Sequence, residues 1–271
     1  MNSKALFVVP LVVLCVQFAG GQQQSSTATQ KTTTTPTAAA PMTPREMAEL
    51  RGDIQMAEKN YAGGVRIYEG ILRSDREDGP LLNKIGVGYE QLEDFHAAEH
   101  YFKRSMKADK TFVSPINNLG TIEYAKKNYG KAIRYYKKAV KLRDDLGAVY
   151  SNLGYAYFGK KEYALAIDAF QRAIAVDPEV FAQHGSSGSI LQQRTTTDPG
   201  LFYFIVAKTY AEGGDAEDAA HYLKLARDAE YQQFLSAETD PAFAKVIKDP
   251  RVQEVLVVPP SYERNRKMVQ N

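Results

Sequence analysis

The chain has 271 residues, of which 44% are hydrophobic and 24% charged, and its formal net charge is +2 at pH 7. These values are ordinary for a globular protein and exclude a fibrous or wholly disordered chain. Because basic and acidic side chains nearly balance, the molecule as a whole has no field that would attract nucleic acid or an anionic membrane. Cys15 is the only cysteine, so a chain cleaved after it has no disulfide, no thiol nucleophile and no cysteine-based zinc site.

Residues 1–21 have the pattern of a secretory signal peptide. Lys4 precedes an apolar run over residues 5–16, and small residues follow at Ala19, Gly20 and Gly21. The run is shorter than the roughly 20 apolar residues that cross a bilayer, and the residue before Cys15 is a leucine, where bacterial lipoprotein signals have a small residue. We therefore expect an exported protein, periplasmic or secreted, with no transmembrane segment in the mature chain.

A polar segment separates this signal from the rest of the chain. Residues 22–44 are rich in Gln, Ser, Thr and Pro and have almost no large apolar side chains. Such a composition buries too little surface to offset the entropy of an ordered chain. We expect residues 22–44 to be a disordered tether.

Residues 45–179 contain four copies of one pattern, with an interval of 34 residues. One column of the pattern is glycine: Gly52, Gly86, Gly120 and Gly154. Two more are aromatic: Tyr61, Phe95, Tyr129 and Tyr163, then Tyr68, Phe102, Tyr136 and Phe170. Apolar residues fall at helical spacing on both sides of a polar break in each copy, which predicts a pair of antiparallel helices per unit.

The pattern resembles the tetratricopeptide repeat. The best-matching unit contains the family's residues in order: Leu153, Gly154, Tyr157, Ala166, Phe170, Ala173 and Pro178. The resemblance implies an all-α fold, a right-handed α-solenoid of about five helix hairpins. The first unit departs most from the family, with Arg51 and Gln55 at columns that are usually apolar, so we interpret it as a solvated end cap.

A fifth unit follows a long insertion. Its columns continue through residues 200–232, displaced 53 residues from the fourth unit: Ala207, Tyr210, Ala219, Leu223 and Ala226. Residues 180–199 are the insertion, whose Gly, Ser and Thr content predicts an exposed loop. Within residues 233–258, Asp240-Pro241 and Asp249-Pro250 are typical helix starts. We predict short capping helices there and a loose basic tail over residues 259–271.

The resemblance also implies a binding surface, because the first helix of each unit lines the concave side of such a solenoid. The predicted partner-binding groove consists of Asn83, Val87, Glu90, Asn117, Thr121, Tyr124, Ser151, Tyr155 and Phe158. Tyr124, Tyr155 and Phe158 have rings that can stack on a peptide or a sugar. Asn83 and Asn117 have amides that can bond to a peptide backbone.

No constellation in the sequence predicts catalysis, and we expect no catalytic, cofactor-binding or metal-binding residues. His96 and His100 are one helical turn apart, but no third ligand is evident. Nucleophile-elbow, phosphate-loop and dinucleotide motifs are absent from the sequence. Residues 126–143 hold eight basic side chains and no acidic one. We interpret this stretch as a solvated basic face, with an acidic protein or polymer as the alternative ligand and no nucleic-acid partner.

The sequence thus predicts a non-catalytic, exported scaffold that binds a protein or peptide in the cell envelope through its concave groove. A polysaccharide-binding envelope module stays open, since aromatic groove residues also suit sugars. An accessory subunit of a secretion, pilus or outer-membrane assembly system is a further alternative.

Overall fold

The computed structural model describes residues 41–74, 76–181 and 198–257, and its regular elements in these ranges are all helices. The all-α class is thereby confirmed. The predicted signal peptide, all but the end of the tether, residues 182–197 of the insertion and the basic tail lie outside the described residues.

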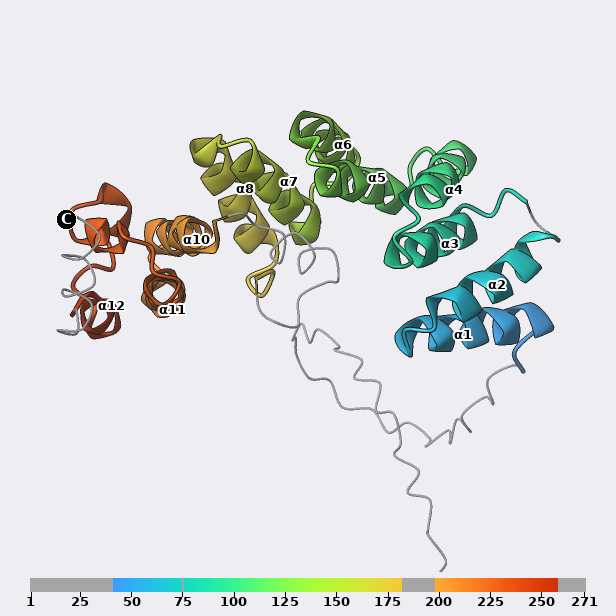
Figure 1. Ribbon diagram of the computed structural model, residues 1–271, viewed down its shortest axis with the longest axis horizontal. Helices are drawn as coiled ribbons and strands as arrows, with labels where there is room; N and C mark the ends of the chain where they lie inside the picture. Colours follow the sequence, from blue (N-terminus) through green and yellow to red (C-terminus); the bar gives the residue numbers. More distant parts are fainter. Residues whose placement is uncertain (1–40, 75, 182–197, 258–271) are drawn as a thin grey trace, which may run out of the picture. The chain divides into compact units, whose positions relative to one another are not determined.

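Ten of the helices form antiparallel hairpins, which follow one another in chain order (Figure 1). The pairs are α1 (Pro44–Ala57) with α2 (Tyr61–Leu72), α3 (Gly79–Gln91) with α4 (Phe95–Ala108), α5 (Val113–Ala125) with α6 (Tyr129–Leu142), α7 (Gly147–Gly159) with α8 (Tyr163–Val176), and α10 (Pro199–Gly213) with α11 (Ala216–Asp228). In each of the first four hairpins the second helix also packs against the first helix of the next hairpin. This is the helix-hairpin solenoid predicted from the repeats.

The turn inside each hairpin is set by one left-handed residue. Lys59, Glu93, Lys127 and Lys161 have φ between 59° and 65°, and they stand 34 residues apart. A left-handed residue ends a helix by turning the chain out of its axis. In the fifth hairpin Gly214, with φ of 87°, takes this place. Each hairpin therefore has the same tight connection.

The glycine and aromatic columns of the sequence meet inside each hairpin. A Cβ atom on Gly120 of α5 would lie 2.5 Å from Cε1 of Tyr136 on α6. Only glycine at position 120 therefore leaves room for the Tyr136 ring. Gly52, Gly86 and Gly154 face Tyr68, Phe102 and Phe170 in the same way. The fifth hairpin instead buries Ala207 at the glycine column and Leu223 at the aromatic column. Alanine is larger than glycine and leucine is smaller than Tyr or Phe, so the two changes compensate.

Polar side chains connect the first two hairpins. The Lys84 ammonium on α3 bonds to Asp53 at 2.7 Å and to Glu49 at 2.8 Å, both on α1. The hydroxyls of Tyr89 and Tyr101 both donate to one carboxylate oxygen of Glu69 on α2, each at 2.9 Å. Specific hydrogen bonds therefore add to a small apolar cluster at this junction.

Aromatic rings connect the fourth and fifth hairpins. Phe202 of α10 stacks on Tyr155 of α7, with ring centroids 5.1 Å apart. Phe181, from the chain after α8, lies edge-on to Phe170 at 5.2 Å, and its carbonyl accepts a hydrogen bond from the Tyr222 hydroxyl. Val180 and Phe181 are both buried. Packed structure thus continues two residues into the segment predicted as an exposed loop, because these side chains fill the space beside α8.

The C-terminal end of the stack is covered by short helices. These are η1 (Phe234–Glu238), η2 (Pro241–Phe243) and α12 (Pro250–Leu256). The Asp240 and Asp249 side chains accept from backbone N–H groups at the starts of η2 and α12, as their sequence pattern predicts. Phe243 and Val252 are fully buried. The end of the last hairpin is therefore shielded from water.

The N-terminal helix α1 is largely exposed to solvent, as expected of an end cap, but its exposed surface includes apolar side chains. Met47, Leu50 and Ile54 share one face of α1 and are 44% to 47% exposed. In a stack, this face of a first helix would pack on the preceding hairpin, and α1 has none among the described residues. The outer face of α1 is consequently more apolar than its Arg51 and Gln55 indicated.

Candidate functional site

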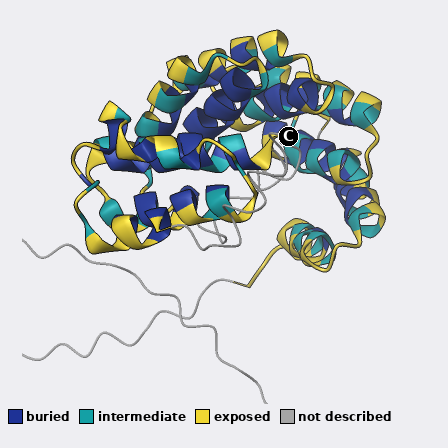
Figure 2. Cartoon of the chain, turned by 60° about the vertical axis from the view of Figure 1, so that its left-hand side comes forward, coloured by how far each residue is buried: buried dark blue, intermediate teal, exposed yellow. Residues whose placement is uncertain are grey.

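The nine predicted groove residues lie on α3, α5 and α7, and α5 contacts both of the other two helices. We call the face that they define the first-helix face. Their exposure divides them into two sets. Asn83, Val87, Glu90 and Asn117 are half-buried. Thr121, Tyr124, Ser151, Tyr155 and Phe158 are buried, and Figure 2 shows the buried residues as dark bands on the helices.

The three aromatic residues of the predicted groove pack inside the protein. Tyr155 is 1% exposed and Phe158 is 5% exposed, because Phe202 of α10 covers both rings. Tyr124 is also buried and lies edge-on to Tyr129, with centroids 5.3 Å apart. None of these rings is free to stack on a ligand. Helical spacing placed them correctly on the first helices, but it did not show that Phe202 of α10 covers Tyr155 and Phe158.

Four asparagine side chains form a hydrogen-bonded ladder across the first-helix face. Asn118 on α5 donates to Asn83 on α3 at 3.1 Å, and Asn152 on α7 donates to Asn117 on α5 at 2.9 Å. Asn117 and Asn118 are joined at 3.4 Å. The sequence predicted Asn83 and Asn117 as ligand-binding, whereas Asn118 and Asn152, which precede the Leu-Gly of two repeats, were not among the predicted groove residues. The structure joins all four in one amide ladder.

The amide ladder has an unused acceptor at one end. The Asn152 side-chain oxygen is buried and has no hydrogen-bond partner within the described chain. An unpaired buried amide oxygen costs roughly 1–3 kcal/mol, and natural proteins usually satisfy such atoms with a protein group, a water or a ligand. At the other end, Asn83 accepts a hydrogen bond but donates none within the described residues. The ladder therefore keeps an unused donor at the half-buried Asn83 end, while the unused acceptor at the Asn152 end is fully buried.

Glu90 adds a titratable group to the same face. It stands seven residues after Asn83 on α3, about two helical turns away. Burial raises the pKa of the Glu90 carboxyl from its ordinary value of 4.5 to about 7. Within the described residues this carboxyl has no ion pair or hydrogen bond that would hold it charged. Near neutral pH, Glu90 thus switches between a neutral donor and a charged acceptor.

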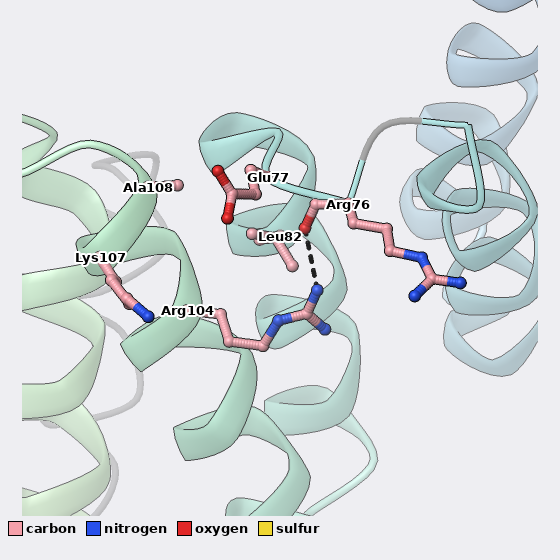
Figure 3. Close-up of a pocket in the computed structure, with 6 residues that line it drawn as sticks. All are labelled: Arg76, Glu77, Leu82, Arg104, Lys107 and Ala108. Carbon is pink, nitrogen blue, oxygen red and sulfur yellow. Dashed lines mark hydrogen bonds between the residues drawn. The ribbon is translucent and has the colours of Figure 1, made fainter.

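Shallow depressions lie elsewhere on the described surface. One, of about 300 Å³, is lined by Arg76, Glu77, Leu82, Arg104, Lys107 and Ala108 (Figure 3). Another of about 300 Å³ is lined by residues of α11 and α12, including His221. His96 and His100 are exposed on α4. Within the described ranges, no group of three or more His, Cys, Asp or Glu side chains has the geometry to hold a metal ion.

Membrane-spanning helices are not found in the part of the chain that the structure describes. None of the helices there combines the length and hydropathy that crossing a bilayer requires.

The repeated helical hairpins define this chain as a helical-repeat protein. Comparison with known families identifies which repeat it contains. Models of the tetratricopeptide repeat match residues 80–112 and 113–179. The chain therefore contains tetratricopeptide repeats over α3 to α8, which include the whole first-helix face. No curated protein sequence matches the chain.

Several solved structures have a similar fold. PilF of Pseudomonas aeruginosa is 15% identical, with a TM-score of 0.52 over 83% of this chain and 91% of that protein. MamA of Desulfovibrio magneticus is 18% identical, with a TM-score of 0.49 over 71% of this chain and 99% of its own. YrrB, described as a tetratricopeptide-repeat protein with an unusual peptide-binding site, is 17% identical, with a TM-score of 0.45 over 71% of this chain and 91% of its own. At these identities the likeness to PilF supports the fold alone.

Proposed function

We propose that this protein is a non-catalytic scaffold of the cell envelope that binds an extended segment of a partner protein along the first-helix face. The amide ladder is the observation that carries the proposal. A peptide backbone offers an N–H donor and a C=O acceptor at every residue, and an asparagine amide offers the complementary pair. Main-chain recognition of this kind holds a segment without requiring one particular sequence.

The details of the ladder support a bound main chain. A backbone carbonyl of the bound segment would accept a hydrogen bond from the half-buried Asn83 amide, whose N–H groups have no partner within the described residues. Val87 lies one turn after Asn83 on α3 and supplies apolar contact. Protonated Glu90 donates a hydrogen bond to a carbonyl, and ionised Glu90 accepts one from an N–H. Tetratricopeptide repeats in general serve as surfaces for peptides and proteins, which agrees with this use of α3, α5 and α7.

Export belongs to the proposal and depends on the N-terminal sequence. The apolar run after Lys4 and the small residues near position 20 favour a signal peptide. The polysaccharide alternative has lost its main support, because the three rings proposed to stack on sugar are buried. Nothing in the described residues singles out a secretion, pilus or outer-membrane assembly machine, so we propose no particular assembly.

Site-specific photo-crosslinking tests the proposed function. A benzoyl-phenylalanine at Val87 places the reactive group on the first-helix face, and the same residue at Ala164, exposed on α8, is the matched control. After irradiation of cells, we expect Val87 to crosslink a defined set of envelope proteins that Ala164 does not capture. Identical products from both positions, or products from Ala164 alone, would contradict binding at this face.

A second pair of variants tests the ladder itself. Combining Asn83→Ala with Asn117→Ala removes two of its amides, and the Val87 crosslink should weaken several-fold. Asn128→Ala, which removes an amide outside the first helices, should leave it unchanged. Circular dichroism establishes that each variant is folded. A crosslink that survives the double substitution would show that the ladder is only structural, and fractionation of the cells separately tests export.

A further inference from the structure

The second helix of the third hairpin presents a line of positive charge. α6 buries Ala132, Ile133, Tyr136 and Ala139 against its neighbours. On the opposite side α6 exposes four basic residues, three or four positions apart except for the adjacent pair at 137 and 138. We call these four residues the basic stripe: Arg134, Lys137, Lys138 and Lys141. Helical geometry places all four within about a third of a turn of one another.

The charges of the basic stripe are not neutralised by the protein. Other cations of the same stretch have acidic partners: Lys126 pairs with Glu99 at 3.1 Å and Arg143 with Asp145 at 2.8 Å. None of the four stripe residues forms an ion pair within the described residues. The C-terminal end of the helix dipole lies beside Lys141 and stabilises positive charge there. Lys137 lies 5.6 Å from the centroid of the Tyr157 ring, but no acidic side chain neutralises it. The stripe is therefore a concentrated surface charge without ion pairs in the described residues, on a molecule whose net charge is only +2.

The positive surface continues onto α4. The Lys138 ammonium lies 3.5 Å from the Met106 sulfur, which brings the stripe next to the last turn of that helix. Lys107 follows Met106, is exposed and lines the depression shown in Figure 3, together with Arg76 and Arg104. The Arg104 guanidinium is held in place because it donates to the Arg76 carbonyl at 2.9 Å. Figure 3 shows the Arg76 guanidinium pointing away from the other lining residues, so Arg104 and Lys107 supply the positive charge of this depression, beside the carboxylate of Glu77.

We propose that the basic stripe, continued by Lys107, is a second binding surface that docks an acidic, extended peptide segment of a partner protein. Neighbouring stripe residues have Cβ atoms about 5–6 Å apart. Side chains on one side of an extended peptide repeat every 6.5–7 Å or so, which allows successive carboxylates to reach successive cations.

Other polyanions fit this surface less well. Single-stranded nucleic acid binds to exposed aromatic rings between basic residues. Of the tyrosines here, Tyr136 is fully buried, Tyr129 packs over Gly159, and Tyr135 is half-buried and packs against the apolar clusters on both sides of α6. A helix that binds a membrane surface inserts a broad apolar face, whereas Leu142, at 42%, is the one substantially exposed large apolar residue of α6. The surface offers charge without a fully exposed ring or a broad apolar face, which suits an acidic peptide.

Fluorescence anisotropy with a labelled deca-glutamate peptide tests the inference. The stripe variant combines Arg134→Gln, Lys138→Gln and Lys141→Gln. A control variant removes the same charge from α7–α8 and α11 with Lys160→Gln, Arg172→Gln and Lys224→Gln, all exposed positions. We expect the parent to bind the peptide, the stripe variant to bind it about tenfold more weakly or worse, and the control to change by no more than about twofold. Because each contact is screened, raising the salt concentration should weaken the parent's binding strongly and the stripe variant's only slightly.

Other results would overturn the inference. Equal weakening in both variants would show that only net charge matters, and no binding by the parent would remove the proposed ligand. Tighter binding to oligothymidylate or to vesicles rich in anionic phospholipid than to the peptide, lost in the stripe variant, would assign the surface to that polyanion instead. The Asn83 and Asn117 substitutions should not affect peptide binding, which keeps this test independent of the first-helix face.

Discussion

Among single residues, polar groups within the helices matter most for the proposed function. Asn152 and Glu90 both keep a polar group on the first-helix face that the protein itself leaves unsatisfied. Retaining such groups costs stability. Asn152 is fully buried, whereas Glu90 is half-buried, so Glu90 is the one of the two that a ligand on this face can contact.

The raised pKa of Glu90 predicts a pH-dependent stability. Because burial raises the folded-state pKa to about 7 from 4.5, the folded protein binds a proton more tightly than the unfolded chain does. Its favourable contribution is fully present below about pH 4.5 and is lost as the pH rises through 7. Glu90→Gln should match the parent in urea unfolding at pH 4.5 and exceed it by about 1–2 kcal/mol at pH 8. If Glu90→Gln and the parent had the same free energy of unfolding at pH 4.5 and again at pH 8, the Glu90 carboxyl would be well solvated in the folded protein.

Among the helical elements, each of the first four hairpins is held by the contact between a helical glycine and the ring facing it. The contact brings the two helix axes together and buries Tyr68, Phe102, Tyr136 and Phe170 almost completely. The repeated left-handed residue fixes the connection between the same two helices. Close packing and a fixed turn together give each unit one geometry, which is why the units stack regularly.

A pair of glycine substitutions separates packing from helix propensity. Alanine at Gly120 would collide with the Tyr136 ring, and we expect Gly120→Ala to lower the free energy of unfolding by about 1–3 kcal/mol. Gly70, also helical, has nothing within 4 Å of the position that a Cβ atom would take, so Gly70→Ala should raise it by about 0.5–1 kcal/mol. Urea unfolding measures both. A stabilising Gly120→Ala would mean that α5 and α6 separate at little cost.

Over the whole described chain, stability should be uneven. One continuous apolar cluster runs through α5 to α12, whereas α1 and α2 share a smaller cluster with α3. In repeat proteins each unit is stabilised by itself and by its neighbours. The first hairpin has one neighbouring hairpin among the described residues, and part of that junction is polar. Local opening is therefore expected to start at α1 and α2.

Hydrogen exchange measured by mass spectrometry tests this gradient. Peptides from α1 and α2 should exchange at least tenfold faster than peptides from α7 and α10, whose aromatic rings pack together. Uniform protection from α1 to α11 would instead indicate that the polar bonds of Lys84 and Glu69 couple the first hairpin as strongly as the aromatic contacts couple the last.

The repeating hairpins and the helices that carry the candidate site could be predicted from the sequence. The 34-residue columns placed the glycines and their facing rings, because packing of two helices demands small and large residues at fixed intervals. The fifth unit and the caps at Asp240 and Asp249 could be located too, since these follow from local chemistry. Asn83 and Asn117 were assigned to the groove because the resemblance to the tetratricopeptide repeat implies that first helices line the concave side.

Which of those residues are available to a ligand depends on the tertiary structure. Whether Tyr155 and Phe158 face a ligand is set by α10, which returns to α7 after a long insertion whose path no periodicity specifies. The amide ladder likewise joins residues of three helices, so its hydrogen bonds depend on how the hairpins pack. Burial and side-chain pairing are set by contacts between units, whereas the repeat pattern reports contacts within them.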